Sequence, residues 1–350
     1  MNAQQKELTP LDVALEAILG DIVAADLDTE VLSLDRCVDR VLAQNVFSDI
    51  RVPPTDNSAV DGYVVSADLC GLEDSQKVAV VARIPAGYVP SPLPPSSAAR
   101  IFTGAAIPEN GAAVVMQEDC QVNEEHVLLP VNINNFQNIR PAGQDIEAGT
   151  KILSKGLLLK PADIGLAASV GLAKLSVQKK LKVAIFSTGD ELVEPGQEAP
   201  AGKIYNSNRY ALAALLTRLS VETLDLGVVP DDFEATVKTL KRSECADLVI
   251  SSGGVSVGEE DHVKAALGKT GKLQLWNLAI KPGKPLAFGR VGSTPFLGLP
   301  GNPSSVFVTF CLFAIKVIGK LRDQNSDSQH PICLPAFFEI SSAGSRAEYV

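Results

Sequence analysis

Two neighbouring acids follow an apolar stretch near the middle of the chain. The run Lys182–Ser187 reads as a buried strand, and Thr188-Gly189-Asp190-Glu191 comes directly after it. Glycine allows a backbone to approach a ligand closely, and carboxylates together with phosphate oxygens are the ligands that Mg²⁺ prefers. This loop therefore predicts a metal site, and the alternative is a turn whose two acids are only solvated.

A second loop is dense in glycine and serine. It follows the expected strand Asp247–Ser251 and contains Gly253, Gly254 and Ser256 before it ends in Asp261. Backbone N–H groups and hydroxyls in such a run can bind an anion, although the spacing matches neither a P-loop nor a dinucleotide-binding fingerprint. Asp261 is either a metal ligand or only the cap of the helix that follows.

Two further segments could add contacts to an anion. Ser305 lies in the first turn of an apolar helix, in which Asn302 is a candidate cap and Pro303 suits the first position. Lys281 and Lys284 flank a stiff proline-glycine turn, and in an acidic protein two rigidly held lysines can form an oxyanion clamp. A solvated hairpin turn is the alternative for that segment.

The elements that must position these loops alternate regularly from residue 181 onward. Strands are expected at 182–187, 221–229, 247–251, 273–280, 285–290 and 296–299. Helices separate the first four of these, and we expect Asp231 to cap the helix that follows 221–229. Alternating units of this kind predict a doubly wound, mostly parallel α/β sheet covered on both faces. Ligands bind beyond the carboxyl ends of such strands, where these loops lie.

The rest of the chain predicts further domains. Residues 51–141 hold short apolar runs between proline, glycine and asparagine, which indicates a small, mostly β domain. We expect it to be inserted into an elongated α+β domain made of 1–50 and 142–180. The α/β module should span 181–325, and 326–350 reads as the start of a C-terminal β domain that breaks off.

Composition excludes several classes of protein. The formal net charge is −10 without a basic stripe, which argues against nucleic-acid binding. The N-terminus lacks a signal core, the apolar run 306–318 is shorter than a membrane span, and the six cysteines show no metal or redox spacing. We therefore expect a cytoplasmic protein with no membrane partner, and no Ser/His/Asp triad is suggested.

Several motifs taken together resemble one family. In chain order they are Pro53–Tyr63, Thr103-Gly104-Ala105, Arg140–Ile146, Thr188–Leu192, Gly202–Asn208, Ser252–Gly258, Lys281–Pro285 and Pro300–Ser305. Each is weak alone, but their ordered occurrence along nearly the whole chain is similar to the MoeA family of molybdopterin molybdenumtransferases, which includes the E domain of gephyrin.

The resemblance implies a reaction and assigns residues to it. Such enzymes cleave adenylylated molybdopterin with a divalent cation, here Mg²⁺, insert molybdate and release AMP. By position, Lys281, Lys284 and Ser305 would hold molybdate, and Glu191, Asp231 and Asp261 would serve the metal and pyrophosphate. Asp61, Thr103, Arg140 and Asp145 would complete the pocket from the other domains, in a homodimer. A molybdopterin adenylyltransferase and molybdoenzymes are the possible protein partners.

Two other functions compete with an insertase. A non-catalytic molybdopterin-binding or scaffold protein of the same fold is one, motivated by Asn277 where the family often has lysine. A molybdopterin adenylyltransferase is the other, because it shares the α/β module. The two N-terminal domains argue against it, since that enzyme is typically a single module.

Overall fold

The computed structural model describes residues 8–123, 125–255, 262–270, 273–325, 332, 334–335, 337 and 344–349. The chain divides into two compact units. The first consists of Met1–Gln44, Lys155–Ile164 and Lys174–Val350, and the second of Asn45–Ser154 and Gly165–Ala173.

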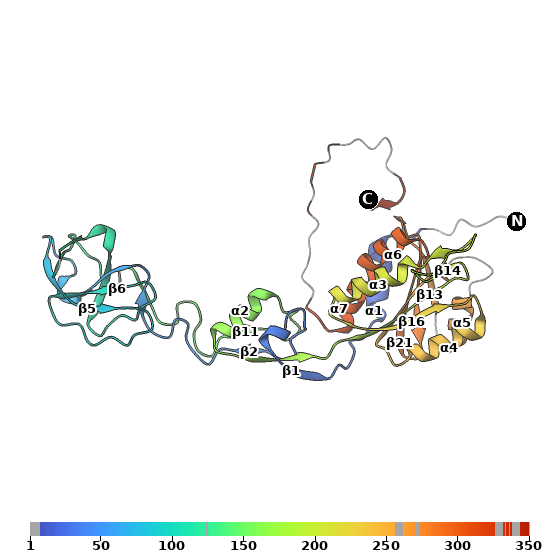
Figure 1. Cartoon of the computed structure of the whole chain (residues 1–350), viewed down its shortest axis with the longest axis horizontal. Coiled ribbons are helices and arrows are strands. Elements are labelled where there is room, and N and C mark those ends of the chain that lie inside the picture. Colours follow the sequence, from blue (N-terminus) through green and yellow to red (C-terminus); the bar gives the residue numbers. More distant parts are fainter. Residues whose placement is uncertain are drawn as a thin grey trace. The chain divides into compact units, whose positions relative to one another are not determined.

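A six-stranded sheet forms the centre of the first unit (Figure 1). Its order is β16-β13-β17-β21-β20-β18. The strands are β13 (Lys182–Thr188), β16 (Glu222–Val229), β17 (Leu248–Ser252), β18 (Leu273–Asn277), β20 (Pro285–Val291) and β21 (Thr294–Leu299). The first four in the order are parallel, and β20 runs antiparallel to both of its neighbours. The prediction of a mostly parallel sheet is therefore confirmed.

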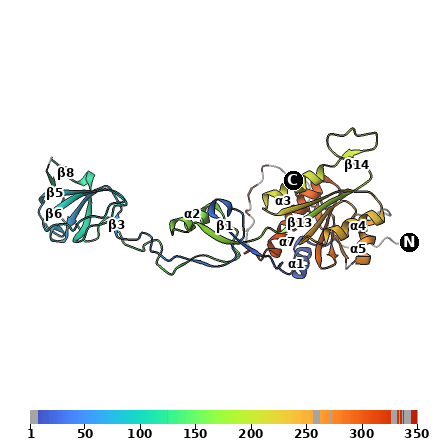
Figure 2. The same cartoon turned by 60° about the horizontal axis from the view of Figure 1, so that its bottom comes forward.

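Helices cover both faces of this sheet, because consecutive side chains of each buried strand point to opposite faces. Val183 and Ile185 of β13 belong to the core that also contains side chains of α1, α3, α6 and α7. Ala184 and Phe186 belong to a second core on the opposite face, with α4 and α5. Figures 1 and 2 show these two groups of helices on either side of the sheet. The module is thus doubly wound, as the sequence predicts.

The helices of the first unit begin close to the expected positions. They are α1 (Leu11–Asp21), α3 (Ser207–Arg218), α4 (Phe233–Ser243), α5 (His262–Thr270), α6 (Pro303–Thr309) and α7 (Ile315–Leu321), with the short helix η1 (Leu34–Arg36). One capping prediction is wrong. Asp232, not Asp231, caps α4 by accepting the Ala235 N–H at 2.7 Å. The carboxylate of Asp231 instead accepts a hydrogen bond from another loop.

The last helical segment is continuous from Pro303 to Leu321, because a π-helical turn, η4 (Phe310–Ala314), joins α6 to α7. At 19 residues it is longer than the apolar run seen in the sequence, and by length and composition alone it could cross a membrane. Half of its apolar window is buried inside the structure, where Val306, Phe310 and Phe313 join the core. Core helices of soluble proteins pass the same test, so this segment is weak support for a membrane span.

Among the described residues, five short strand pairs lie outside the two six-stranded sheets. β1 (Thr29–Ser33) pairs with β12 (Lys174–Gln178), and β2 (Val46–Phe47) with β11 (Lys151–Leu153). β14 (Leu192–Val193) pairs with β15 (Ile204–Tyr205), and β19 (Ile280–Lys281) with β22 (Ala347–Glu348). Strand β14 directly follows Glu191 in the sequence, so the pair β14-β15 lies next to the loop that carries this residue.

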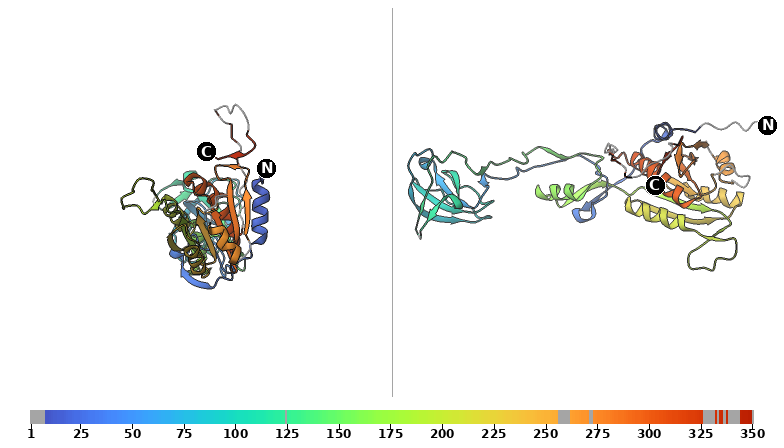
Figure 3. Two further views of the ribbon diagram at one scale, coloured as in Figure 1. Left: turned by 90° about the vertical axis from the view of Figure 1, so that its right-hand side faces the viewer. Right: turned by 90° about the horizontal axis from the view of Figure 1, so that it is seen from above.

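The second unit has its own six-stranded, mostly antiparallel sheet in the order β7-β4-β6-β5-β9-β8 (Figure 3, light blue to green). Its strands are β4 (Gly62–Ser66), β5 (Lys77–Ile84), β6 (Ser97–Ile101), β7 (Gly111–Met116), β8 (Gln121–Val122) and β9 (His126–Leu128). The unit also contains β3 (Asn57–Ser58) paired with β10 (Ile139–Arg140), and the short helices η2 (Ala67–Leu69) and η3 (Gln117–Asp119). Helix α2 (Pro161–Ser169) begins in the first unit and ends in the second. The domain boundaries expected from the sequence stay a prediction.

Candidate functional site

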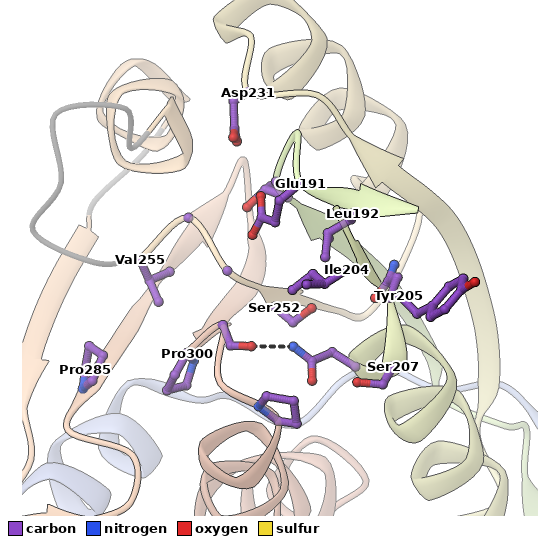
Figure 4. A pocket seen from close by; sticks show the side chains of 18 residues that line it. Glu191, Leu192, Ile204, Tyr205, Ser207, Asp231, Ser252, Val255, Pro285 and Pro300 are labelled. Carbon is purple, nitrogen blue, oxygen red and sulfur yellow. Dashed lines mark hydrogen bonds between the residues drawn. The ribbon is translucent and has the colours of Figure 1, made fainter. Parts of the chain in front are cut away.

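A cavity of about 330 Å³ lies at the carboxyl ends of the parallel strands. That size suits a small-molecule ligand. Its lining comes from the ends of β13 and β17, from the segments after β13, β16, β17 and β21, from β14 and β15, and from the starts of β20, α3 and α6. The lining residues are Thr188, Gly189, Glu191, Leu192, Ile204, Tyr205, Asn206, Ser207, Asn208, Asp231, Ser252, Gly253, Gly254, Val255, Pro285, Pro300, Gly301 and Pro303 (Figure 4).

Two predicted metal ligands, Glu191 and Asp231, meet in this cavity and lie at the same end of it (Figure 4). Asp231 is held by Asp190, because each backbone N–H donates to the other's carboxylate at 3.1 Å. Among the described residues, no cluster of three His, Cys, Asp or Glu side chains suits a metal. The third predicted ligand, Asp261, lies outside the described residues. Magnesium commonly uses only one or two carboxylates plus substrate phosphates, so the two acids that are present fit that metal.

Gly253 and Gly254 form the tight turn that the sequence predicts after β17. Both have positive φ values, 87° and 66°. A Cβ on Gly253 would lie 2.9 Å from the Thr188 carbonyl oxygen, and one on Gly254 would lie 2.6 Å from Val263 Cγ2. Only glycine suits this conformation and this space, so the backbone itself borders the cavity. Ser256, predicted to join this anion site, lies outside the described residues.

Neutral polar residues also line the cavity, among them Ser252, Asn206 and Asn208, and buried Ser187 joins two of them. Ser187 Oγ and Ser252 Oγ are 2.8 Å apart, and Ser187 Oγ lies 3.3 Å from Asn206 Oδ1. Asn208 Nδ2 donates to the Gly301 carbonyl at 2.7 Å, which joins α3 to the loop after β21 (dashed line in Figure 4). No role of Asn206 or Asn208 was predicted from the sequence. The run Asn206-Ser207-Asn208 before a helix was the available signal.

An ion-pair network connects the segment after β14 with helix α3 and strand β16. Arg209 Nε lies 2.8 Å from both carboxylate oxygens of Asp225, and its Nη1 lies 2.8 Å from Glu194 Oε1. Tyr210 Oη donates to Glu194 Oε2 at 2.8 Å. Hydrogen bonding to Asp225 is the main cause that raises the pKa of Arg209. The network ties Glu194, which directly follows β14, to helix α3 and strand β16.

The predicted molybdate ligands do not line the cavity within the described part of the chain. Lys281 and Lys284 are exposed, and Lys281 Nζ lies 3.1 Å from Glu348 Oε1 of β22. Ser305 is 7% exposed, and its backbone N–H donates to the Asn302 cap at 3.3 Å. Pro285 and Pro303, which stand next to these segments, do border the cavity.

The four predicted residues of the second unit form two close pairs. Thr103 donates to Asp61 Oδ1 through both its backbone N–H and its hydroxyl, each at 2.8 Å. These two bonds are the main cause that lowers the pKa of Asp61. Arg140 Nη2 lies 2.6 Å from Asp145 Oδ2 in a half-exposed ion pair. The fold thus brings Asp61 and Thr103 into contact although they are 42 residues apart in the sequence.

A doubly wound α/β sheet with a glycine turn and paired carboxylates at the strand ends defines a class of anion- and metal-binding modules. Comparison with known families narrows this class. Residues 184–320 match a family described as a probable molybdopterin binding domain, and residues 9–171 match the MoeA N-terminal region, domains I and II. The chain belongs to the MoeA family of molybdopterin molybdenumtransferases, which are transferases of molybdenum cofactor biosynthesis.

Individual relatives support this assignment. The molybdopterin molybdenumtransferase of Haemophilus influenzae is 43% identical over 306 residues, which cover 87% of this chain and 75% of that protein. The protein of the same name from a Nostoc species is 41% identical, covering 92% and 76%. A crystal structure of the molybdopterin biosynthesis MoeA protein from Pyrococcus horikoshii OT3 has a TM-score of 0.77 at 31% identity, covering 91% of this chain and 80% of that one.

Proposed function

We propose that this chain is a cytoplasmic enzyme that inserts molybdate into adenylylated molybdopterin and releases AMP with the help of Mg²⁺. The observation that carries the proposal is the cavity at the strand ends, where two carboxylates, a glycine turn and neutral polar groups face one space. A ligand with a charged linkage and a polar heterocycle needs this combination. A non-catalytic scaffold is not favoured, because the relatives named above are transferases and both carboxylates are present.

Glu191 and Asp231 are the residues that would hold Mg²⁺. No hydrogen bond to the Glu191 carboxylate is seen among the described residues, and only one oxygen of Asp231 accepts one, so oxygens remain for a metal. When bound, Mg²⁺ supplies charge neutralisation on the phosphate oxygens of the substrate. Asp261 is proposed as a further ligand on the basis of the sequence resemblance.

The chain's own residues would orient the linkage that is cleaved. Gly253 and Gly254 leave the backbone exposed at the cavity, so that phosphate oxygens can approach it without meeting a Cβ. Ser256 is proposed to add a hydroxyl to the same cradle. Preorganised donors of this type stabilise developing charge without rearrangement during the reaction.

Molybdate is a tetrahedral dianion, and we propose Lys281, Lys284 and Ser305 as its ligands by sequence resemblance. The exposed Lys281–Glu348 pair is weak, as surface ion pairs usually are, so an anion can compete for that ammonium group. Replacing either lysine with glutamine should raise the molybdate concentration needed for half-maximal insertion. An unchanged molybdate dependence in both variants would remove them from the site.

We also propose a homodimer in which Asp61, Thr103, Arg140 and Asp145 complete the pocket of a second copy. Mixing inactive Asp61→Asn with inactive Glu191→Gln tests this arrangement. In a symmetric dimer, exchange of subunits should restore about a quarter of the wild-type activity, because half of the molecules are mixed and one of their two sites is intact. If no activity returns after exchange has been verified, Asp61 and Glu191 of different copies do not form a shared pocket.

The reaction itself is tested by incubating the protein with adenylylated molybdopterin, Mg²⁺ and molybdate. AMP should appear only when the metal is present, and the product should activate a molybdoenzyme that lacks its cofactor. A molybdopterin adenylyltransferase would instead consume ATP to adenylylate molybdopterin. Detection of that activity alone would reject the insertase. Both an adenylyltransferase and molybdoenzymes are proposed as partners, since they supply the substrate and accept the product.

A further inference from the structure

Asn206 holds a buried donor that has no partner in the part of the chain that the structure describes. It follows β15 and caps α3, and it is one of the residues that line the cavity, while only 1% of the residue is exposed. Its Oδ1 accepts the backbone N–H of Arg209 at 3.2 Å. Within the described residues, no acceptor lies within hydrogen-bonding reach of Nδ2.

The cap determines which end of the amide is left without a partner. Rotating the amide by half a turn would bring Nδ2 against the Arg209 N–H, so two donors would face each other and the helix would lose its cap. The orphan group is therefore the NH₂. Buried polar groups in folded proteins almost always find a partner, and a donor left idle at a ligand cavity calls for an acceptor on the ligand.

The surroundings of Asn206 indicate what kind of acceptor this is. The cavity has Glu191 and Asp231 at one end, while Ser207, Ser252 and Tyr205 lie toward the other (Figure 4). No Lys, Arg or His is among its described lining residues. A charged phosphate is best placed near the metal ligands, so a neutral part of the ligand faces the amide.

We propose that Asn206 Nδ2 donates a hydrogen bond to a ring carbonyl oxygen or ring nitrogen of the substrate's heterocycle. Asn206 is then a specificity-determining residue, because a site built to donate a hydrogen bond rejects ligands that lack the acceptor. The inference rests on the proposed function, since adenylylated molybdopterin supplies the heterocycle. Its pterin and its adenine offer the same acceptor chemistry.

Two variants of Asn206 remove the Nδ2 donor while keeping an oxygen that can cap α3. Asn206→Asp keeps an oxygen that accepts the Arg209 N–H and removes the NH₂, and Asn206→Ser keeps a capping oxygen without adding charge. Asn325→Asp is the matched control, because it removes an amide donor whose acceptor among the described residues is the Lys155 carbonyl, at an exposed position outside the cavity. Thermal unfolding of each variant verifies that the fold is kept.

Binding is measured by calorimetry with two probes, AMP and molybdopterin, each added alone to the full chain. Both Asn206 variants should bind one of the probes about 10- to 100-fold more weakly than wild type, or roughly 1.4–2.8 kcal/mol. The probe that weakens identifies the ring that Asn206 contacts. Asn325→Asp should bind both probes as wild type does.

Unchanged affinity of both Asn206 variants for both probes, with a wild type that binds them, would overturn this inference alone. It would mean that a water, not the ligand, satisfies Nδ2. A wild-type protein that binds neither probe would overturn the proposed function, and the role of Asn206 with it. The two failures are therefore distinguishable.

Discussion

Asp190 and Asp231 hold each other through reciprocal hydrogen bonds, in which each backbone N–H donates to the other residue's carboxylate at 3.1 Å. The contact joins the loops after two adjacent parallel strands, β13 and β16. It also fixes the backbone at the end of the cavity that carries Glu191 and Asp231, because Glu191 directly follows Asp190. The pair therefore positions one proposed metal ligand and includes another.

Replacement of Asp190 with alanine tests this positioning role. The Asp231 N–H loses its acceptor, so we expect the Mg²⁺ concentration for half-maximal AMP release to rise roughly three- to tenfold. Asp190→Asn keeps an acceptor oxygen and should recover most of the loss. If Asp190→Asn raises this Mg²⁺ concentration as much as Asp190→Ala does, the negative charge of Asp190 is required and its hydrogen bond to the Asp231 N–H is not the cause.

Gly253 provides a second test, on the turn after β17. With φ at 87° and the Thr188 carbonyl in the way of a Cβ, Gly253→Ala should lower the free energy of unfolding by about 1–3 kcal/mol. AMP affinity should fall as well, since the turn borders the cavity. Gly268→Ala is the control. It lies inside α5 with no atom within 4 Å of an added Cβ, and it should be stabilising by about 0.5–1 kcal/mol.

Much of the α/β module could be predicted from the sequence, because buried strands such as Lys182–Thr188 are continuous apolar runs. Their carboxyl ends must share one edge of the sheet, which is why Glu191 and Gly253 could be expected to meet there, whereas Asp231 was assigned to the site only by the family resemblance. The Asn302 cap with Pro303 at the first helical position was also predicted and is confirmed.

Other features depend on contacts that the sequence does not display. Asp231 was expected to cap α4, but its pairing with Asp190 joins loops that are 41 residues apart, and Asp232 caps the helix instead. The Lys281–Glu348 pair spans 67 residues and could not be read from the turn alone. Asn206 was missed because a helix cap and a ligand donor have the same sequence signature.

The pair of Asp61 and Thr103 predicts a pH dependence. Because the folded-state pKa of Asp61 is lowered, its contribution to stability is present above its unfolded pKa and is lost as the pH falls through the folded value. An NMR titration should give Asp61 a pKa below the ordinary 3.8. Thr103→Val removes the hydroxyl donor and should raise that pKa part of the way, since the backbone N–H remains. An unchanged pKa in Thr103→Val would show that the hydroxyl does not bind the carboxylate in solution.

Glu191 is proposed to hold Mg²⁺ at the site where AMP is released, and the most direct test of this role is the rate of AMP release as a function of Mg²⁺ concentration. Glu191→Gln keeps the shape of the side chain but removes its charge, and we expect a rate loss of at least ~100-fold together with a weaker apparent Mg²⁺ affinity. Glu198→Gln, an exposed acid in the same segment that does not line the cavity, should behave as wild type. Glu191→Gln with the wild-type rate and Mg²⁺ dependence would contradict the account.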